Sequence, residues 1–286
     1  STLMRSSAAS DVYKRQDMLT DITLGQYYPG SSVIHGLDPR AKILATLLFI
    51  AAIFFAESML SYGVLALFVA AVILLSRLPV LMVLRSVKPL WIIILLTLFI
   101  HAFTGEGSNV LYQYGFFRLT EEGLIMGIKM SLRLVFLLLI SSILTFTTSP
   151  IVLTDGIESL LRPFKCIGVP AHELAMMMTI ALRFIPTLIE ETDRIIKAQT
   201  ARGADFDSGS LLQRARNMLP ILIPLFISAF RRADELAIAM EARCYRGGEG
   251  RTRMHELVYK TGDFIALAII VLLIAVLAVM RWGLGL

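Results

Sequence analysis

The longest apolar run in the chain limits the possible folds more than any other feature. It extends from Ala41 to Leu75 and is interrupted only by Glu57, Ser58 and a few small polar residues. A single helix of that length would measure roughly 50 Å, whereas the hydrocarbon core of a bilayer is about 30 Å thick. We therefore expect two membrane-spanning helices that turn near Glu57.

The composition of the whole chain agrees with a membrane location. Of the 286 residues, 56% are hydrophobic, and the mean hydropathy is +0.73, whereas soluble domains are about 45–50% apolar. The formal net charge is +5. Lys and Arg retained in cytoplasmic loops explain this charge more simply than nucleic-acid binding does, so we expect no nucleic-acid partner. We expect a multi-pass membrane protein.

Three further apolar runs predict three further membrane helices, at Leu90–Phe103, at about Gly123–Thr148 and at Phe264–Met280. The loop before the first of them carries Arg77, Arg85 and Lys88. The following segment, Thr104–Glu122, carries carboxylates and only Arg118 as a base. Because cytoplasmic loops concentrate Lys and Arg, the basic loop is expected inside and Thr104–Glu122 outside.

These observations predict the following domain organisation. Residues 1–17 are expected to be a segment foreign to the natural protein, with a natural start at Met18, and four membrane helices follow within residues 18–150. Residues 151–257 form a cytoplasmic module, and residues 258–286 hold the fifth membrane helix. In that module a short helix is expected around Asp155–Phe164, with Thr154 as its N-cap.

The segment from Ala171 to Arg246 contains a duplicated pattern. Asp193, Ala198 and Ala201-Arg202-Gly203 recur as Asp234, Ala239 and Ala242-Arg243-Cys244, at a constant offset of 41 residues. Each copy ends a long segment with apolar residues at steps of three and four, which is typical of an amphipathic helix. Pro186, Pro220 and Pro224 are expected to bend these helices.

Sequence motifs for catalysis are missing. No Gly-x-x-x-x-Gly-Lys-Ser/Thr loop occurs, so the chain cannot hydrolyse ATP through a P-loop. His172-Glu173 and His255-Glu256 lack the second histidine of a zinc-protease motif, and no nucleophile elbow occurs. We therefore expect no catalytic residue, no metal site and no cofactor in this chain.

Two amphipathic helices that cannot bury their apolar stripes alone need a partner surface. An arginine at the end of each helix predicts two similar acceptors, because a guanidinium makes forked hydrogen bonds to carboxylates and carbonyls in a groove. Small neighbours would let the backbone approach such a groove closely. The predicted docking residues are Ala201, Arg202, Gly203, Ala242, Arg243 and Cys244.

These residues resemble a known family. The opening Thr23–Gly30 with Leu37–Lys42, the Ala201-Arg202-Gly203 end, and Glu241-Ala242-Arg243 followed by Tyr245-Arg246-Gly247 are similar to the transmembrane T component of energy-coupling factor (ECF) type ABC transporters. The resemblance covers Met18 to Leu286. Cys244 departs from the family's usual Gly or Ser.

The resemblance implies an all-α, polytopic protein of a prokaryotic cell membrane, with about five transmembrane helices and a cytoplasmic coupling module of long, crossing amphipathic helices. It also implies that the chain couples two ABC-type ATPase subunits, which bind the ATP, to a substrate-capturing membrane subunit for vitamin or other micronutrient uptake. Arg202 would enter one ATPase and Arg243 the other. The expected contacts with the capturing subunit are Met178, Leu182, Ile185, Leu222, Phe226 and Phe230.

Two alternatives remain open. One is an intramembrane protease that uses glutamate and histidine, for which Glu190-Glu191 and His101 are the candidates although their spacing does not fit. The other is the membrane subunit of a dedicated metal-ion importer, which shares the ancestry and the helix-end motifs.

Overall fold

The computed structural model describes residues 27–104, 110–114, 117–204, 206, 210–247 and 257–283. The expected foreign segment at residues 1–17 lies outside the described residues. Contacts divide the rest into two compact units. We call residues 25–160 with 255–286 the membrane unit, and residues 161–254 the insert unit. Each is described by itself.

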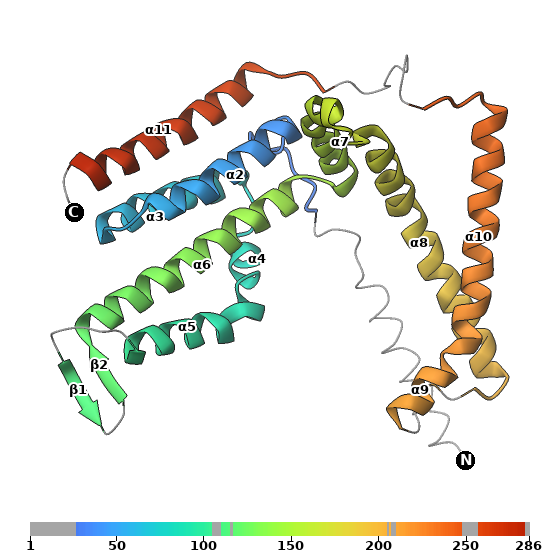
Figure 1. Ribbon diagram of the computed structural model, residues 1–286, viewed down its shortest axis with the longest axis horizontal. Coiled ribbons are helices and arrows are strands. Elements are labelled where there is room, and N and C mark those ends of the chain that lie inside the picture. Colours follow the sequence, from blue (N-terminus) through green and yellow to red (C-terminus); the bar gives the residue numbers. More distant parts are fainter. Residues whose placement is uncertain are drawn as a thin grey trace. The chain divides into compact units, whose positions relative to one another are not determined.

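The membrane unit is a bundle of helices drawn in blue, green and red in Figure 1. Its elements are α2 (Pro39–Phe55), α3 (Met59–Ser76), α4 (Val80–Arg85), the 3-10 turn η1 (Lys88–Leu90), α5 (Trp91–Thr104), α6 (Glu121–Thr147), α7 (Pro150–Leu161) and α11 (Thr261–Gly283). The helices α2 and α3 are separated by Ala56–Ser58, which confirms the turn expected near Glu57.

The core of this unit forms where α2, α3, α4, α6 and α11 meet. Phe49, Leu65, Val83 and Leu277 are each completely buried within one apolar cluster. At the cytoplasmic end predicted for α2, the buried Lys42 ammonium donates hydrogen bonds to Thr147 O at 3.0 Å and Thr148 Oγ1 at 3.3 Å. A cation at the carboxyl end of a helix is favourable, so Lys42 fastens α2 to the end of α6.

Glycines bring α6 against α5. A Cβ added at Gly123 would lie 2.7 Å from His101 O, and one added at Gly127 would lie 3.0 Å from Leu98 O. Small residues four apart let two helix backbones approach closely, as is common among membrane helices. The contact fixes the pair of helices around the predicted outer loop.

That loop contains an element that the sequence analysis did not predict. The strands β1 (Val110–Tyr114) and β2 (Phe117–Thr120) pair as an antiparallel hairpin between α5 and α6. The β-branched and aromatic composition of these residues, Val-Leu-Tyr-Gln-Tyr and Phe-Arg-Leu-Thr, is the signal that could have indicated it. Thr120 then caps α6 by accepting a hydrogen bond from Gly123 N.

The insert unit contains the 3-10 turn η2 (Arg162–Ile167) and the helices α8 (Ala171–Ala201), α9 (Leu211–Asn217) and α10 (Leu219–Ala242). Two details of the expectation are wrong. The hydroxyl of Thr154 does not cap a helix, because it lies inside α7 and donates to Pro150 O. Pro220 lies in the first turn of α10, where a helix needs no backbone donor, while Pro186 and Pro224 lie inside their helices.

Five helical segments in the described part of the chain are long and apolar enough to cross a membrane: Met59–Ser76, Val80–Phe103, Glu121–Thr147, Ala171–Ala201 and Thr261–Trp282. The polytopic, helical class is therefore confirmed, but the set differs from the predicted one in two members. The helix α2, with 17 residues and a length of roughly 26 Å, is not among these five segments. The least apolar member is α8, whose second half carries Glu190, Glu191, Asp193, Arg194 and Lys197, and such charges are costly in hydrocarbon.

Candidate functional site

The two arginines among the predicted docking residues, Arg202 and Arg243, occupy the same position at the ends of α8 and α10. Each is the C-cap of its helix, with backbone angles φ −85°, ψ 4° for Arg202 and φ −90°, ψ 13° for Arg243. Both side chains belong to exposed residues. The duplicated sequence therefore builds a duplicated local structure.

The hydrogen bonds that close the two helix ends correspond one to one. After α8, Gly203 N donates to Thr200 O and Ala204 N donates to Gln199 O. After α10, Cys244 N donates to Glu241 O and Tyr245 N donates to Met240 O. Both sets form the Schellman motif, in which the chain reverses through one residue in the left-handed region.

The reversing residue is where the two copies differ. Gly203 has φ +87° and Cys244 has φ +55°. Glycine adopts this conformation without steric cost, whereas a side chain makes it unfavourable by about 1–2 kcal/mol. Cys244 thus keeps the geometry of the first copy, but it does so under backbone strain.

An ion pair joins α8 to α10 at corresponding positions of the repeat. Arg232 Nη2 donates to Glu191 Oε2 at 2.6 Å, and these residues are 41 positions apart, the offset that also relates the two arginine caps. The sequence did not predict this pair, because the offset marks equivalent positions and does not say which of them meet. Each member lies 11 residues, or roughly 16 Å of helix, before its arginine cap.

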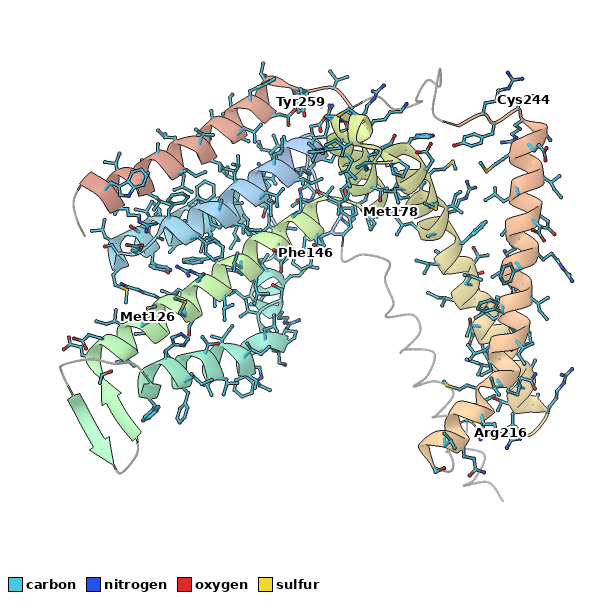
Figure 2. All side chains as sticks on the ribbon, viewed as in Figure 1. Met126, Phe146, Met178, Arg216, Cys244 and Tyr259 are labelled. Atoms are coloured by element: carbon cyan, nitrogen blue, oxygen red, sulfur yellow. The ribbon has the colours of Figure 1, made fainter. Side chains whose placement is uncertain are left out.

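The two helices run in opposite directions, so their arginine caps lie at opposite ends of the pair (Figure 1). The label of Cys244 in Figure 2 marks the end of α10, and Arg216 lies in α9 near the beginning of α10. Tyr245 Oη lies 3.4 Å from His172 Nε2, which connects the end of α10 to the start of α8. Because its two members occupy equivalent positions, the ion pair is the same number of residues from each arginine cap along the helix.

The apolar stripes of the insert unit are exposed. Of the residues that the structure describes in α8 and α10, only Ala171, Ala175 and Ile221 are buried. The residues predicted to meet a capturing subunit are exposed at Met178, Ile185, Leu222, Phe226 and Phe230, and partly buried at Leu182. The rings of Phe226 and Phe230 lie 5.3 Å apart, so they form one continuous apolar ridge on α10.

The structure offers no observation that favours the two alternative functions. Glu191 is engaged by Arg232, and His101 Nδ1 donates a hydrogen bond to Thr97 O at 2.9 Å in α5. Within the described ranges, no group of three or more His, Cys, Asp and Glu side chains could hold a metal ion. The two free cysteines, Cys166 and Cys244, are exposed.

Comparison with known proteins places the chain in a family. The model of the CbiQ family, described as cobalt transport protein, matches residues 30–255. The energy-coupling factor transporter transmembrane protein EcfT of Acidaminococcus fermentans is 68% identical over 266 residues, which is 93% of this chain and 99% of that protein.

Proteins with the same name from other bacteria are also similar along their length. The one from Clostridium kluyveri is 55% identical over 269 residues, covering 93% of this chain and all of the relative. The one from Bacillus subtilis is 47% identical over 264 residues, covering 92% of this chain and all of the relative. The chain belongs to the CbiQ family, which includes the transmembrane proteins of energy-coupling factor transporters.

Proposed function

We propose that this chain is the transmembrane coupling component of an energy-coupling factor importer. In this function it joins two ATPase subunits, which bind and hydrolyse the ATP, to a membrane subunit that captures the substrate. The chain is a multi-pass membrane protein whose insert unit faces the cytoplasm. It has no catalytic role of its own and needs no cofactor.

The observation that carries the proposal is the pair of matching arginine-capped helix ends. Ala201-Arg202-Gly203 and Ala242-Arg243-Cys244 share their backbone angles, their closing hydrogen bonds and their exposure. A guanidinium at an exposed helix end with small neighbours suits insertion into a groove lined by carboxylates or carbonyls. Two such ends, each 11 residues from its member of the Glu191–Arg232 ion pair, suit two related ATPase subunits.

The exposed apolar ridge supports the second partner. Large contiguous apolar surfaces on a protein usually mark a binding site for another protein or for lipid. Met178, Leu182 and Ile185 on α8 and Leu222, Phe226 and Phe230 on α10 are the apolar residues that we assign to contacts with the capturing subunit. Movement of the ATPases would change the crossing of α8 and α10 and thereby move the subunit that rests on them.

Variants of the two arginines test the docking. The chain is co-expressed with its two ATPases and the complex is purified through a tag on one ATPase. Arg202→Glu and Arg243→Glu should each reduce recovery of this chain and ATP-driven uptake, because an opposite charge in an interface costs several kcal/mol. Their combination should abolish both.

Arg231→Glu is the matched control, because Arg231 is an exposed arginine in the middle of α10. It changes the net charge as each tip variant does, and we expect it to leave recovery of the complex unchanged. Normal recovery and uptake in the double tip variant would refute the docking proposal.

A further inference from the structure

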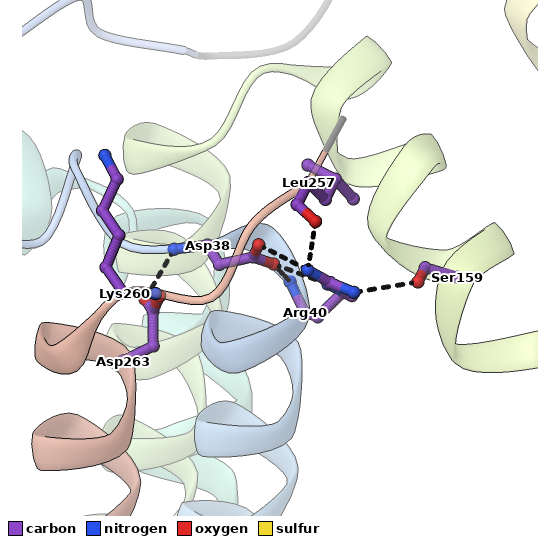
Figure 3. A network of polar contacts seen from close by, with 6 residues as sticks. All are labelled: Asp38, Arg40, Ser159, Leu257, Lys260 and Asp263. Atoms are coloured by element: carbon purple, nitrogen blue, oxygen red, sulfur yellow. Dashed lines mark hydrogen bonds and ion pairs between the residues drawn. The ribbon is translucent and has the colours of Figure 1, made fainter. Parts of the chain in front are cut away.

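The start of α2 contacts both chain segments that connect the insert unit to the membrane unit. The chain enters the insert unit after α7 and returns from it before α11. Arg40 Nη1 donates to Ser159 Oγ of α7 at 3.3 Å, and Arg40 Nη2 donates to Leu257 O of the returning segment at 2.8 Å. One guanidinium therefore holds both connections, as Figure 3 shows.

The guanidinium is itself fixed by its neighbours. Asp38 accepts from Arg40 Nε at 3.0 Å and from Nη2 at 2.9 Å, in a forked ion pair. The Tyr259 ring centroid lies 3.9 Å from Arg40 Cζ. The side chains of Arg40 and Asp38 are only 13% and 3% exposed. A planar group with its donors used in several directions cannot move without breaking several contacts at once.

Two carboxylates complete this network. Burial raises the pKa of Asp38, but the hydrogen bonds and charge of Arg40 outweigh it, so the pKa lies below its ordinary value and the pair stays ionised at neutral pH. The fully buried Asp263 accepts from Asp38 N and from Lys260 N, both at 2.7 Å. Asp38 caps α2, and Asp263 closes the start of α11 by accepting from the preceding backbone.

Close packing also holds α7, the helix through which the chain enters the insert unit, against the start of α2. A Cβ added at Gly156 of α7 would lie 3.0 Å from Pro39 Cβ and 3.2 Å from Ile43 Cδ1. The start of α2 and the middle of α7 are therefore in close contact. Arg40 lies next to this contact and reaches from it to the returning segment.

We propose that Arg40 is a positioning residue that clamps the two connections of the insert unit to the membrane helices, so that displacement of α8 and α10 moves the membrane unit. This role rests on the proposed coupling function. Without the clamp, the connections at Ser159 and Leu257 can shift independently. Displacement of α8 and α10 by the ATPases then moves these connections and does not move the membrane unit. ATP hydrolysis then continues while transport fails.

The test compares ATP hydrolysis with transport in the complete complex. Arg40→Lys and Arg40→Gln are assembled with the ATPases and the capturing subunit and reconstituted in liposomes. Lysine keeps the charge but cannot make the fork and the two additional hydrogen bonds together. We expect normal assembly and normal ATP hydrolysis, with substrate transported per ATP about tenfold lower, the equivalent of one lost hydrogen bond to a charged group.

Arg85→Gln is the control, because Arg85 is an exposed arginine of the same unit. It should leave the transport per ATP unchanged. Amide hydrogen exchange should show faster opening at residues 257–260 and in α7 for the Arg40 variants and no change in α8 and α10.

A rescue separates clamping from a general structural role. In the Arg40→Gln background, Cys166 and Cys244 are replaced by serine, and cysteines at positions 159 and 257 are joined by a short bifunctional reagent. Cross-linking should restore transport per ATP. The proposal is overturned if the Arg40 variants transport normally, if neither variant assembles, or if the cross-link restores nothing. Failure of the docking proposal is distinct, because it appears as normal assembly in the Arg202 and Arg243 variants.

Discussion

The membrane unit has a buried apolar core, whereas the described helices α8 and α10 of the insert unit bury few apolar residues. In the membrane unit, large apolar side chains such as Phe49, Leu65 and Leu277 are completely buried among the helices. In the insert unit, Phe226 and Phe230 are 64% and 62% exposed. Most helical stability in proteins comes from packing of the apolar face. The described part of the insert unit lacks such a core, which agrees with the proposed role of partner subunits in covering its apolar faces.

The largest expected effect is a difference in stability between matched phenylalanine substitutions in the two units. Phe49→Ala should destabilise the purified chain by about 3–5 kcal/mol, because it leaves a cavity in a packed core. Phe226→Ala should change the stability of the purified chain by no more than about 0.5 kcal/mol. Unfolding in detergent micelles with increasing denaturant measures both.

The same Phe226→Ala variant should weaken association with the capturing subunit about tenfold, because exposed aromatic residues often dominate interfaces. Titration of the capturing subunit against the complex in nanodiscs measures the affinity. Equal loss of stability for Phe49→Ala and Phe226→Ala would show that the two units do not differ in the way described.

Exchanging the charges of the Glu191–Arg232 ion pair between α8 and α10 should have an intermediate effect. Glu191→Arg alone places two arginines together, and Arg232→Glu alone places two glutamates together. Each should reduce transport, and the double exchange should recover most of it, with a coupling energy of about 0.2–1 kcal/mol because both groups are about one-third exposed. If the double variant loses as much transport as the two single variants combined, the arrangement of α8 and α10 does not depend on this pair.

The smallest expected effect concerns the difference between the two helix ends. Cys244→Gly should relieve the left-handed strain and stabilise the end of α10 by about 1 kcal/mol, and Gly203→Ala should cost the end of α8 a similar amount. A Cβ at Gly203 would meet no atom within 4 Å, so only the backbone contributes. Hydrogen exchange at the amides of Tyr245 and Ala204, which close the two ends, reports the changes. No change at either amide would contradict the strain assigned to Cys244.

The sequence predicted the main elements well because their signals are local. Apolar runs located the helices near Ala41–Leu75, Gly123–Thr148 and Phe264–Met280 to within a few residues of α2, α3, α6 and α11. Periodicity and glycine located the ends of α8 and α10 equally well. Threonine can cap a helix or bond to a carbonyl one turn back inside it, and proline fits the first turn as well as a bend, so Thr154 and Pro220 were placed wrongly. The hairpin was missed because its strands are short.

The sequence by itself determined that the chain crosses a membrane, that it carries two copies of an arginine-ended amphipathic helix, and that both need partners. Hydropathy, periodicity and the repeat are properties of neighbouring residues, so they can be read along the chain. Only the tertiary structure decided that Glu191 meets Arg232 and that Arg40 joins Asp38, Ser159 and Leu257. Those contacts link residues far apart in sequence, and they depend on how helices pack, which no local pattern specifies.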